Sequence, residues 1–212
     1  MVVGTFVMGN LINIRFNPTR ELCIIAGPNG VGKTTLWYGL KNPGIEYVNQ
    51  DEIKKNLETQ CGHTVHVNVA SKHAASRMLQ LFRTGCSFAC ETTLDAKKPL
   101  SILSNPKDYN YNVSICYVAP LSVEDCIKNV RKRVENKGHG VPEDTIRIRY
   151  ARSISNFYEI CPHVHNWYLF LNNENNHEFV AQSANGDIKL VKPELVQHLP
   201  QRLQGIFTDI CR

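Results

Sequence analysis

The 212-residue chain lacks long apolar runs, internal repeats and paired cysteines. No segment approaches the roughly 18 to 20 apolar residues that span a bilayer, and no low-complexity tract is present. Its eight cysteines form no CxxC pair and no Cys/His cluster with zinc-site spacing. These absences argue against a membrane-spanning protein, a repeat protein or a zinc module. They favour a reducing, cytoplasmic setting in which Cys23, Cys90 and Cys116 are buried thiols.

The chain also has little excess of charge. Lys and Arg number 24 against 19 Asp and Glu, a formal net charge of +5. This balance suits an anionic ligand and is weak support for nucleic acid binding. With 42% hydrophobic residues, residues 1–212 are predicted to form a single domain. The apolar start has no basic residues typical of an export signal, so residues 1–20 are predicted to be an N-terminal extension or edge strand.

Short apolar runs alternate with helical patterns along the chain. The runs are nearly all apolar, as in strands buried on both faces, and lie at residues 22–26, 45–49, 87–91, 112–119 and 167–171. The helical patterns lie at residues 32–40, around 70–83, 123–137 and 143–158. The sequence therefore predicts an α/β fold with a doubly wound, mostly parallel five-stranded sheet and helices on both faces.

The last two helical patterns have clear starting signals. Ser122 with Asp125 three residues later forms a capping-box-like start, and Pro142 is a favoured first-turn residue. The short loop KGHGV, residues 137–141, separates the two helices. Because this helix–loop–helix is rich in arginine, it is a candidate functional segment.

The strongest signal is GPNGVGKT at residues 27–34, which matches GxxxxGK[ST] between an apolar strand and a helical pattern. The glycines let successive N–H groups surround phosphate oxygens at the positive end of a helix. Lys33 is expected to contact the β- and γ-phosphates, and the Thr34 hydroxyl to bind Mg²⁺. The motif predicts an ATP or GTP site formed by Gly27, Pro28, Asn29, Gly30, Val31, Gly32, Lys33, Thr34 and Thr35.

Two P-loop classes are excluded by missing motifs. The chain has neither the LSGGQ-like signature of transporter-type ATPases nor the NKxD base-reading motif of GTPases. After the P-loop come VNQDEI at residues 48–53, FACETTL at 88–94 and RVENKGHGVPEDTIRIRYARS at 133–153. In this order, the strings resemble the zeta-toxin-like family of small P-loop kinases.

The resemblance implies a P-loop kinase-type fold with an Arg-rich helical lid at about residues 122–158. The best-known members use ATP to phosphorylate UDP-N-acetylglucosamine on a sugar hydroxyl, and a small helical antitoxin restrains them. ATP and Mg²⁺, a small-molecule hydroxyl substrate and an antitoxin-like partner are thus implied. One departure concerns the acceptor. The stretch at residues 72–82 has no carboxylate where characterised toxins have an acidic sugar contact, and its Arg77 favours an anionic partner.

Two carboxylates end predicted strands. A kinase acting on an alcohol needs a carboxylate to orient the hydroxyl and accept its proton, and the resemblance assigns this role to Asp51. The alternative is that Asp51 only caps the next helix. Glu91 is predicted to hold Mg²⁺ or a water bound to it, and to contact the substrate. The alternative is that Glu91 only caps the end of its strand. The resemblance gives Thr93 as a substrate contact.

Arginines flank the loop that contains His139. A γ-phosphoryl group in transfer spreads charge over three oxygens, which arginines stabilise. Arg133 and Arg149 match the family's lid arginines best, although a one-turn shift would substitute Arg131 or Arg147. His139 is either a phosphate or substrate contact or a residue that fixes the loop.

Two other functions stay open. One is a polynucleotide or RNA-end kinase that uses the same residues, and the other is a nucleotide-gated binding module without kinase activity. Binding of a nucleoside triphosphate explains the positive net charge better than binding of a long nucleic acid does. The presence of both Asp51 and the Arg-rich lid favours catalysis over a binding module.

Overall fold

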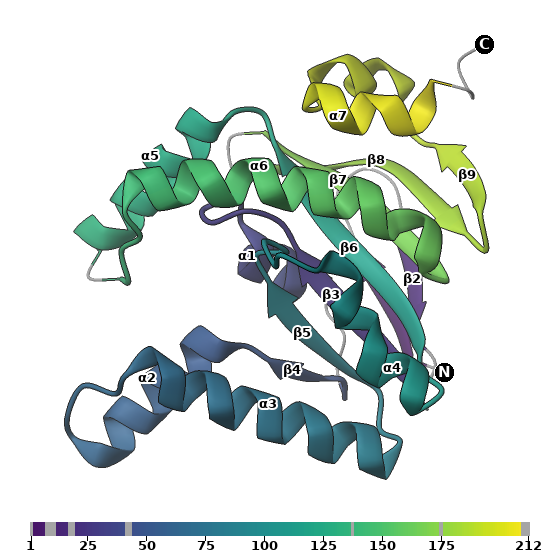
Figure 1. The fold of residues 1–212 in the computed structure, drawn as a ribbon. Helices are drawn as coiled ribbons and strands as arrows, with labels where there is room; N and C mark the ends of the chain where they lie inside the picture. Colours follow the sequence, from purple (N-terminus) through teal and green to yellow (C-terminus); the bar gives the residue numbers. More distant parts are fainter. Residues whose placement is uncertain are drawn as a thin grey trace.

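A computed structural model describes residues 2–6, 12–16, 20–40, 44–136, 138–173 and 176–208. Its centre is a seven-stranded sheet in the order β4-β5-β3-β6-β7-β8-β9 (Figure 1). The strands are β3 (Glu21–Ala26), β4 (Glu46–Val48), β5 (Phe88–Thr92), β6 (Asn112–Pro120), β7 (Asn166–Asn173), β8 (Asn176–Ala184) and β9 (Asp187–Leu190). The first five in sheet order pair in parallel, and β8 and β9 add to β7 as antiparallel strands.

The five predicted strands are the parallel part of this sheet, which confirms the α/β fold class. They are apolar because both of their faces are covered; all six residues of β3, for example, are buried. The predicted number of five strands is wrong, because β8 and β9 extend the sheet. Both added strands mix polar with apolar residues, so no long apolar run marks them. A local signal did exist: Asn185 (φ 51°) and Gly186 (φ 91°) form a two-residue hairpin turn between them.

Helices cover both faces of the sheet. They are α1 (Lys33–Gly39), α2 (Gln50–Cys61), α3 (Val67–Thr84), α4 (Ser104–Asp108), α5 (Val123–Glu135), α6 (Glu143–Ile160) and α7 (Gln201–Gln204). Short 3₁₀ turns lie at η1 (Pro99–Leu103), η2 (Cys161–His163), η3 (Pro193–His198) and η4 (Gly205–Phe207). Helices α1 and α5 pack on one face, and α3 and α7 pack on the other. Helix α6 contributes Ile146 near its start to the apolar cluster on the first face and Ile154, Phe157 and Ile160 to the cluster on the second. Helix α2 has no buried residue, so it gave no apolar pattern from which to predict it.

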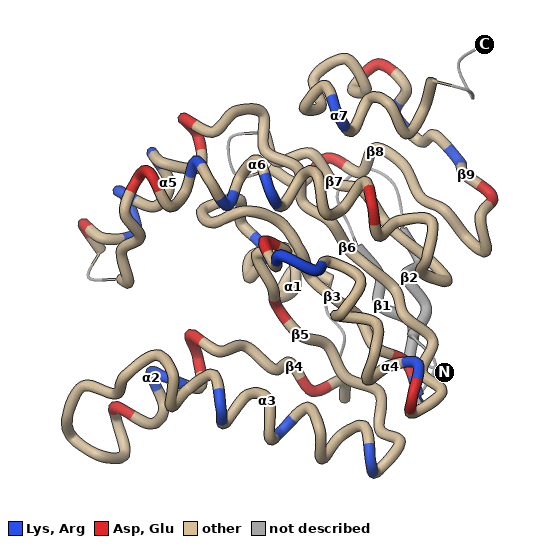
Figure 2. Tube along the Cα trace, in the orientation of Figure 1, with Lys and Arg blue, Asp and Glu red and all other residues tan. Residues whose placement is uncertain are grey.

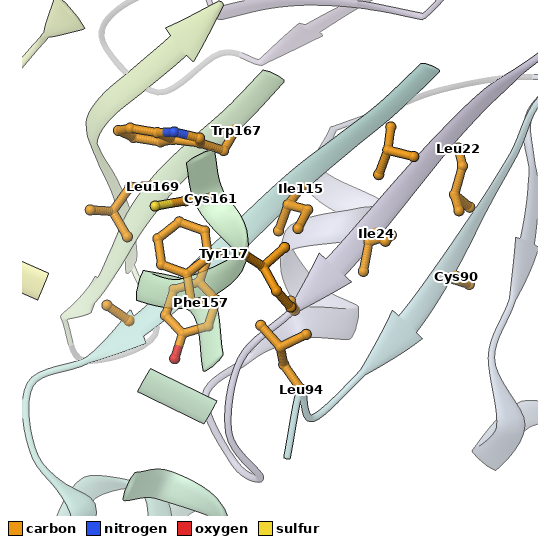
Figure 3. Packing of buried hydrophobic residues seen from close by; sticks show 14 of the residues in the cluster. Leu22, Ile24, Cys90, Leu94, Ile115, Tyr117, Phe157, Cys161, Trp167 and Leu169 are labelled. Carbon is orange, nitrogen blue, oxygen red and sulfur yellow. The ribbon is translucent and has the colours of Figure 1, made fainter. Parts of the chain in front are cut away.

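An aromatic cluster fixes α6 on the sheet. Phe157 of α6 stacks on Tyr117 of β6 with ring centroids 4.2 Å apart, and Trp167 of β7 meets Phe157 edge-on at 6.1 Å (Figure 3). The Tyr117 hydroxyl lies 3.1 Å from the Ser153 hydroxyl, also on α6. The C-terminal half of α6 is therefore held to the central strands by packing and a buried hydrogen bond.

The remaining described strands lie outside the main sheet. β1 (Val2–Phe6) and β2 (Ile12–Phe16) pair with each other in a separate two-stranded antiparallel sheet. The cysteines among the described residues are all free, and Cys23, Cys90 and Cys116 are buried as predicted. Across the described ranges, no helix has both the length and the apolar character needed to cross a membrane.

Candidate active site

The candidate site lies where β3, β4 and β5 end. The P-loop follows β3, Asp51 follows β4 at the start of α2, and Glu91 lies near the end of β5. The carboxyl ends of parallel strands meet at one edge of a sheet, where open α/β proteins bind their ligands. The register of the strands thus brings together groups that are distant in the sequence.

The P-loop backbone requires glycine, as Gly30 and Gly32 show. Gly30 has φ +78°, and a Cβ there would lie 2.4 Å from the carbonyl oxygen of Cys126 in α5. Gly32 has φ +88°, and its Cβ would lie 2.9 Å from Nε2 of His177 in β8. Left-handed backbone and close neighbours both exclude larger residues. The loop leads directly into α1, whose first N–H groups are available to an anion.

Side chains from distant elements support the loop from outside. Asn129 of α5 donates to the Gly30 carbonyl at 2.9 Å, and Asn172 of β7 donates to the Val31 carbonyl at 2.9 Å. His177 is 8% exposed, and within the described residues its Nε2 has no hydrogen-bond partner. Sequence reasoning missed these three residues. They lie 99, 141 and 145 positions from Gly30, Val31 and Gly32, their neighbours in the loop, and no local pattern marks them.

Lys33 is held inside the loop. Its side chain is 6% exposed, and Nζ donates to the Pro28 carbonyl at 3.0 Å and lies 3.7 Å from Glu91 Oε1. Burial lowers the pKa of Lys33, and the Glu91 carboxylate opposes that change. The ammonium is therefore a poorly solvated cation at the position where the motif predicts phosphate.

Glu91 is the centre of a hydrogen-bond network. Its Oε2 accepts from the Thr34 hydroxyl at 2.8 Å, the Tyr47 hydroxyl at 2.6 Å and Asn49 Nδ2 at 3.0 Å. Burial, followed by the nearby Glu91 carboxylate, raises the pKa of Tyr47, which therefore stays a hydrogen-bond donor. Sequence reasoning missed Tyr47 and Asn49. Their spacing of two residues at the end of β4 was the available signal, because such residues share one face of a strand.

The donor set fits Mg²⁺. Thr34 and Glu91 present a hydroxyl and a carboxylate side by side at the end of the P-loop, and hard oxygen ligands suit this ion. Among the residues that the structure describes, no group of three or more His, Cys, Asp or Glu could hold a metal. That also agrees with Mg²⁺, which usually keeps several waters and uses phosphate oxygens instead of a full protein cage.

Asp51 is not the cap of α2. The Asn49 side chain caps this helix by accepting from the N–H groups of Asp51 at 2.8 Å and Glu52 at 3.3 Å. Asp51 is the second residue of α2, exposed, and it lines the central cavity. The cap alternative is therefore wrong, and Asp51 is one of the residues that line the cavity in front of the P-loop.

The structure separates the lid arginines into two groups. Arg133 and Arg149 line the cavity, Arg133 donating to the His139 carbonyl at 2.8 Å and Arg149 pairing with Asp95 at 3.1 Å. The one-turn alternatives instead form exposed ion pairs, Arg131 with Glu143 and Arg147 with Glu124. Figure 2 shows Lys and Arg along both α5 and α6. Two of these cations, matching the preferred alignment, belong to the site.

These groups surround one cavity of about 490 Å³. It is lined by Asn29, Gly30, Lys33, Asn49, Gln50, Asp51, Val67, Glu91, Thr92, Thr93, Arg133, His139, Gly140, Val141, Pro142, Thr145 and Arg149. The P-loop, the starts of α2 and α3, the end of β5 and the α5–α6 turn therefore all contribute to it. Of the predicted catalytic and substrate residues, only Arg77 is not brought to this cavity.

Arg77 lies elsewhere, on α3. Its Nε and Nη2 each lie 2.6 Å from a carboxylate oxygen of Glu46, so the guanidinium is already paired. A larger cavity, of about 660 Å³, lies by the start of β6 and is lined by Tyr111, Asn112 and Val113 among others. It contains none of the predicted site residues. Size alone would misplace the site, whereas the chemistry selects the smaller cavity.

Known proteins share this architecture. No protein-family model matches the chain. A Haemophilus influenzae protein described as uncharacterized is 23% identical over 124 residues, 58% of this chain and 88% of that protein. The solved AvrRxo1-ORF1:-ORF2 complex with ATP aligns with a TM-score of 0.66 and 19% identity, covering 87% of this chain and 64% of that one. The PezAT toxin-antitoxin system of Streptococcus pneumoniae aligns at 0.54 and 17%, covering 92% and 90%.

The fold is that of the P-loop kinases. At these identities the likeness establishes the fold, and at that level it confirms the resemblance to zeta-toxin-like kinases. The chain spans 64% of the AvrRxo1 chain that it matches. A further likeness is to the Pnkp1/Rnl/Hen1 RNA repair complex, at a TM-score of 0.54 and 18% identity over 69% of this chain and 48% of that chain.

Proposed function

We propose that the chain is an ATP- and Mg²⁺-dependent kinase that transfers the γ-phosphoryl group of ATP to a hydroxyl of a small molecule. One observation carries this proposal. A P-loop lysine, a strand-end glutamate, an exposed aspartate and two lid arginines all line one cavity of about 490 Å³. A phosphoryl-transfer site needs a phosphate cradle, a metal-binding carboxylate, a group for the nucleophile's proton and cations for the transferred group.

Each residue then has a role in the transfer. The P-loop amides and Lys33 would hold the β- and γ-phosphates, and Arg133 and Arg149 would stabilise the charge on the moving group. Thr34 and Glu91 would hold Mg²⁺, which when bound neutralises phosphate charge. Asp51 would accept the proton of the acceptor hydroxyl as its oxygen bonds to the γ-phosphorus. The bond from that phosphorus to the β–γ bridging oxygen breaks, and ADP leaves.

The acceptor side of the cavity favours a reacting group that is itself an uncharged hydroxyl, such as that of a sugar ring. Gln50, Asp51, Val67 and Thr93 line that side, and the cations of the lining come from the P-loop and lid. A UDP-sugar, the substrate class implied by the family resemblance, is the first candidate. The likeness to an RNA repair complex makes an RNA 5′-hydroxyl the second. The UDP-sugar is placed first because it carries a single diphosphate, whereas a nucleic acid needs cations at several phosphates along its backbone.

The test is transfer of label from [γ-³²P]ATP, with UDP-N-acetylglucosamine, a metabolite extract and a 5′-hydroxyl RNA oligonucleotide as separate acceptors. We expect a labelled small molecule, and we expect Asp51→Asn to bind ATP normally while losing transfer by at least about a hundredfold. Asp108→Asn, an exposed aspartate on α4, is the matched control. Equal transfer by Asp51→Asn and wild type would remove Asp51 from the mechanism. Labelled RNA alone would replace the small-molecule proposal.

An antitoxin-like protein is a further proposed partner, because the chain covers 90% of the matched chain of a toxin-antitoxin system. Such a partner would restrain the kinase. Affinity purification of the tagged chain from its own cells, followed by a transfer assay, checks this. A bound small protein that leaves transfer unchanged would contradict it.

A further inference from the structure

The turn after β5 joins the acceptor side of the cavity to the lid through one carboxylate. Asp95 Oδ1 accepts from the Thr93 hydroxyl at 2.5 Å, and Asp95 Oδ2 lies 3.1 Å from Nε of Arg149 in α6. Thr93 and Arg149 both line the cavity, but Asp95 is not among the lining residues. Asp95 therefore reaches the reacting groups only through these two neighbours.

The turn is built to hold Asp95 in this place. Leu94 has φ 56°, a left-handed conformation, and its side chain is buried in the cluster that contains Tyr117 and Phe157 (Figure 3). Asn156 of α6 donates to the Leu94 carbonyl at 2.8 Å and to the Ala96 carbonyl at 2.9 Å. The backbone on both sides of Asp95 is thus fixed to the same helix that carries Arg149.

The Arg149 guanidinium is fixed on two sides before a nucleotide arrives. Nε faces Asp95, and Nη1 lies 3.4 Å from Asn29 Oδ1 in the P-loop. A planar cation oriented in this way loses little conformational freedom when a phosphoryl oxygen binds to it.

We propose that Asp95 is a positioning residue that holds Arg149 in its phosphate-binding orientation and links it to Thr93 on the acceptor side. The proposal rests on the proposed phosphoryl transfer. The side chains of Arg149 and Asp95 are 37% and 27% exposed, so the pair contributes little to folding stability. Its effect is on orientation, which catalysis exploits because only a correctly placed cation meets the charge of the transition state.

The first test measures orientation without any catalysis. In the free, ¹⁵N-labelled protein, a carboxylate-bound Nε–H of Arg149 exchanges slowly with water and gives a signal at neutral pH. Arg149→Lys, which lacks that atom, identifies the signal by its disappearance. We expect the signal to be lost in Asp95→Asn and kept in the control Asp108→Asn. A signal that persists in Asp95→Asn would overturn the proposal.

The second test separates the ground state from the transition state. We expect Asp95→Asn to weaken binding of ADP with aluminium fluoride and Mg²⁺ by about 10- to 100-fold, less than the loss of a direct contact costs. Binding of ATP should stay within about threefold of wild type, because orientation matters most in the transition state. Asp95→Ser is the second variant where Asp95→Asn does not fold. Equal weakening of both ligands would overturn the positioning role.

A double-mutant cycle completes the test. If Asp95 acts through Arg149, adding Asp95→Asn to Arg149→Lys should cost no further affinity for the aluminium fluoride complex. Additive losses would show that Asp95 acts by itself and overturn the proposal. A wild-type protein that transfers no phosphoryl group would instead contradict the proposed function. The Nε–H signal would still decide whether Asp95 holds Arg149.

Discussion

The back of the cavity and its front turn hold their functional groups in different ways. The back is the P-loop together with the turn after β5, and the front turn is residues 138–142 between α5 and α6. At the back, Lys33 is 6% exposed and Leu94 is 3% exposed. At the front, Gly138, His139 and Gly140 are exposed, and Arg133 is held by a backbone carbonyl of the turn.

This difference decides where a substitution should change both the folding stability and the catalytic rate. A change to a buried residue at the back removes hydrogen bonds or packing that also support the sheet, so it should affect folding and transfer together. A change in the front turn alters a surface segment with few buried contacts, so it should affect transfer alone. Arg149 belongs to the back, because Asp95 and α6 hold it, whereas Arg133 belongs to the front.

Asn156→Ala gives the largest expected effect and tests the back. Removing its amide leaves the Leu94 and Ala96 carbonyls without that partner, and the side chain is only 8% exposed. We expect the free energy of unfolding to fall by about 2 to 3 kcal/mol, measured by urea denaturation. Transfer should fall as well, since the turn then no longer directs Asp95 to Arg149.

The matched control is Asn136→Ala, whose exposed amide donates to the Lys132 carbonyl near the front turn. It should change the free energy of unfolding by less than about 0.5 kcal/mol. Equal stability losses for the two asparagine variants would remove the distinction between back and front.

Gly138→Ala is the corresponding test of the front, with a smaller effect. A Cβ there would lie 2.6 Å from Arg133 Cγ and 2.8 Å from the Arg133 carbonyl oxygen, so Arg133 must move. We expect the transfer rate to fall about tenfold, which is a small loss for the displacement of a cation that stabilises the transition state. The melting temperature should stay unchanged. In the control Gly140→Ala the new Cβ meets only Val134 Cγ2, at 3.1 Å. If Gly138→Ala unfolds the protein, the turn is part of the folding core.

A substitution of His177 gives the smallest expected effect. It tests the back of the cavity through the pH dependence of folding stability. Burial lowers the pKa of this imidazole below its usual value of about 6.5. The unfolded chain therefore binds a proton at a higher pH than the folded chain does. As the pH falls from about 6.5 towards the folded-state pKa, the free energy of unfolding decreases.

Denaturation of wild type and His177→Leu between pH 5 and pH 8 measures this contribution. The variant should lose less stability on acidification, by up to about 1 kcal/mol. The exposed His73→Leu should follow the wild-type curve. An unchanged pH dependence in His177→Leu would show that His177 is not held neutral behind the P-loop.

Much of the fold and site could be predicted from local patterns. The five parallel strands are apolar because both their faces are buried. Ser122 caps α5 as predicted, whereas α6 begins one residue after Pro142, at Glu143. The P-loop could be recognised in the sequence because its backbone conformation requires glycine. The residue assignments of Asp51, Glu91, Arg133 and Arg149 came from short strings, and the structure brings all four to one cavity.

Other parts had little or no local pattern from which they could be predicted. Strands β8 and β9 mix polar and apolar residues at the sheet edge, and α2 buries nothing. Asn129 and Asn172 support the P-loop from 99 and 141 residues away. Asp95 looks like an ordinary turn residue until α6 brings Arg149 beside it.

The sequence by itself determined the strand–P-loop–helix unit inside a parallel sheet, on which the proposed phosphate binding rests. The backbone's requirement for glycine and the burial of both sheet faces each act over a few neighbouring residues. They therefore produce local sequence patterns that can be recognised. Only the tertiary structure decided which arginines enter the cavity, what holds Glu91 and why Asp51 is free of capping. Those outcomes depend on strand register and helix packing, which join side chains that are far apart along the chain.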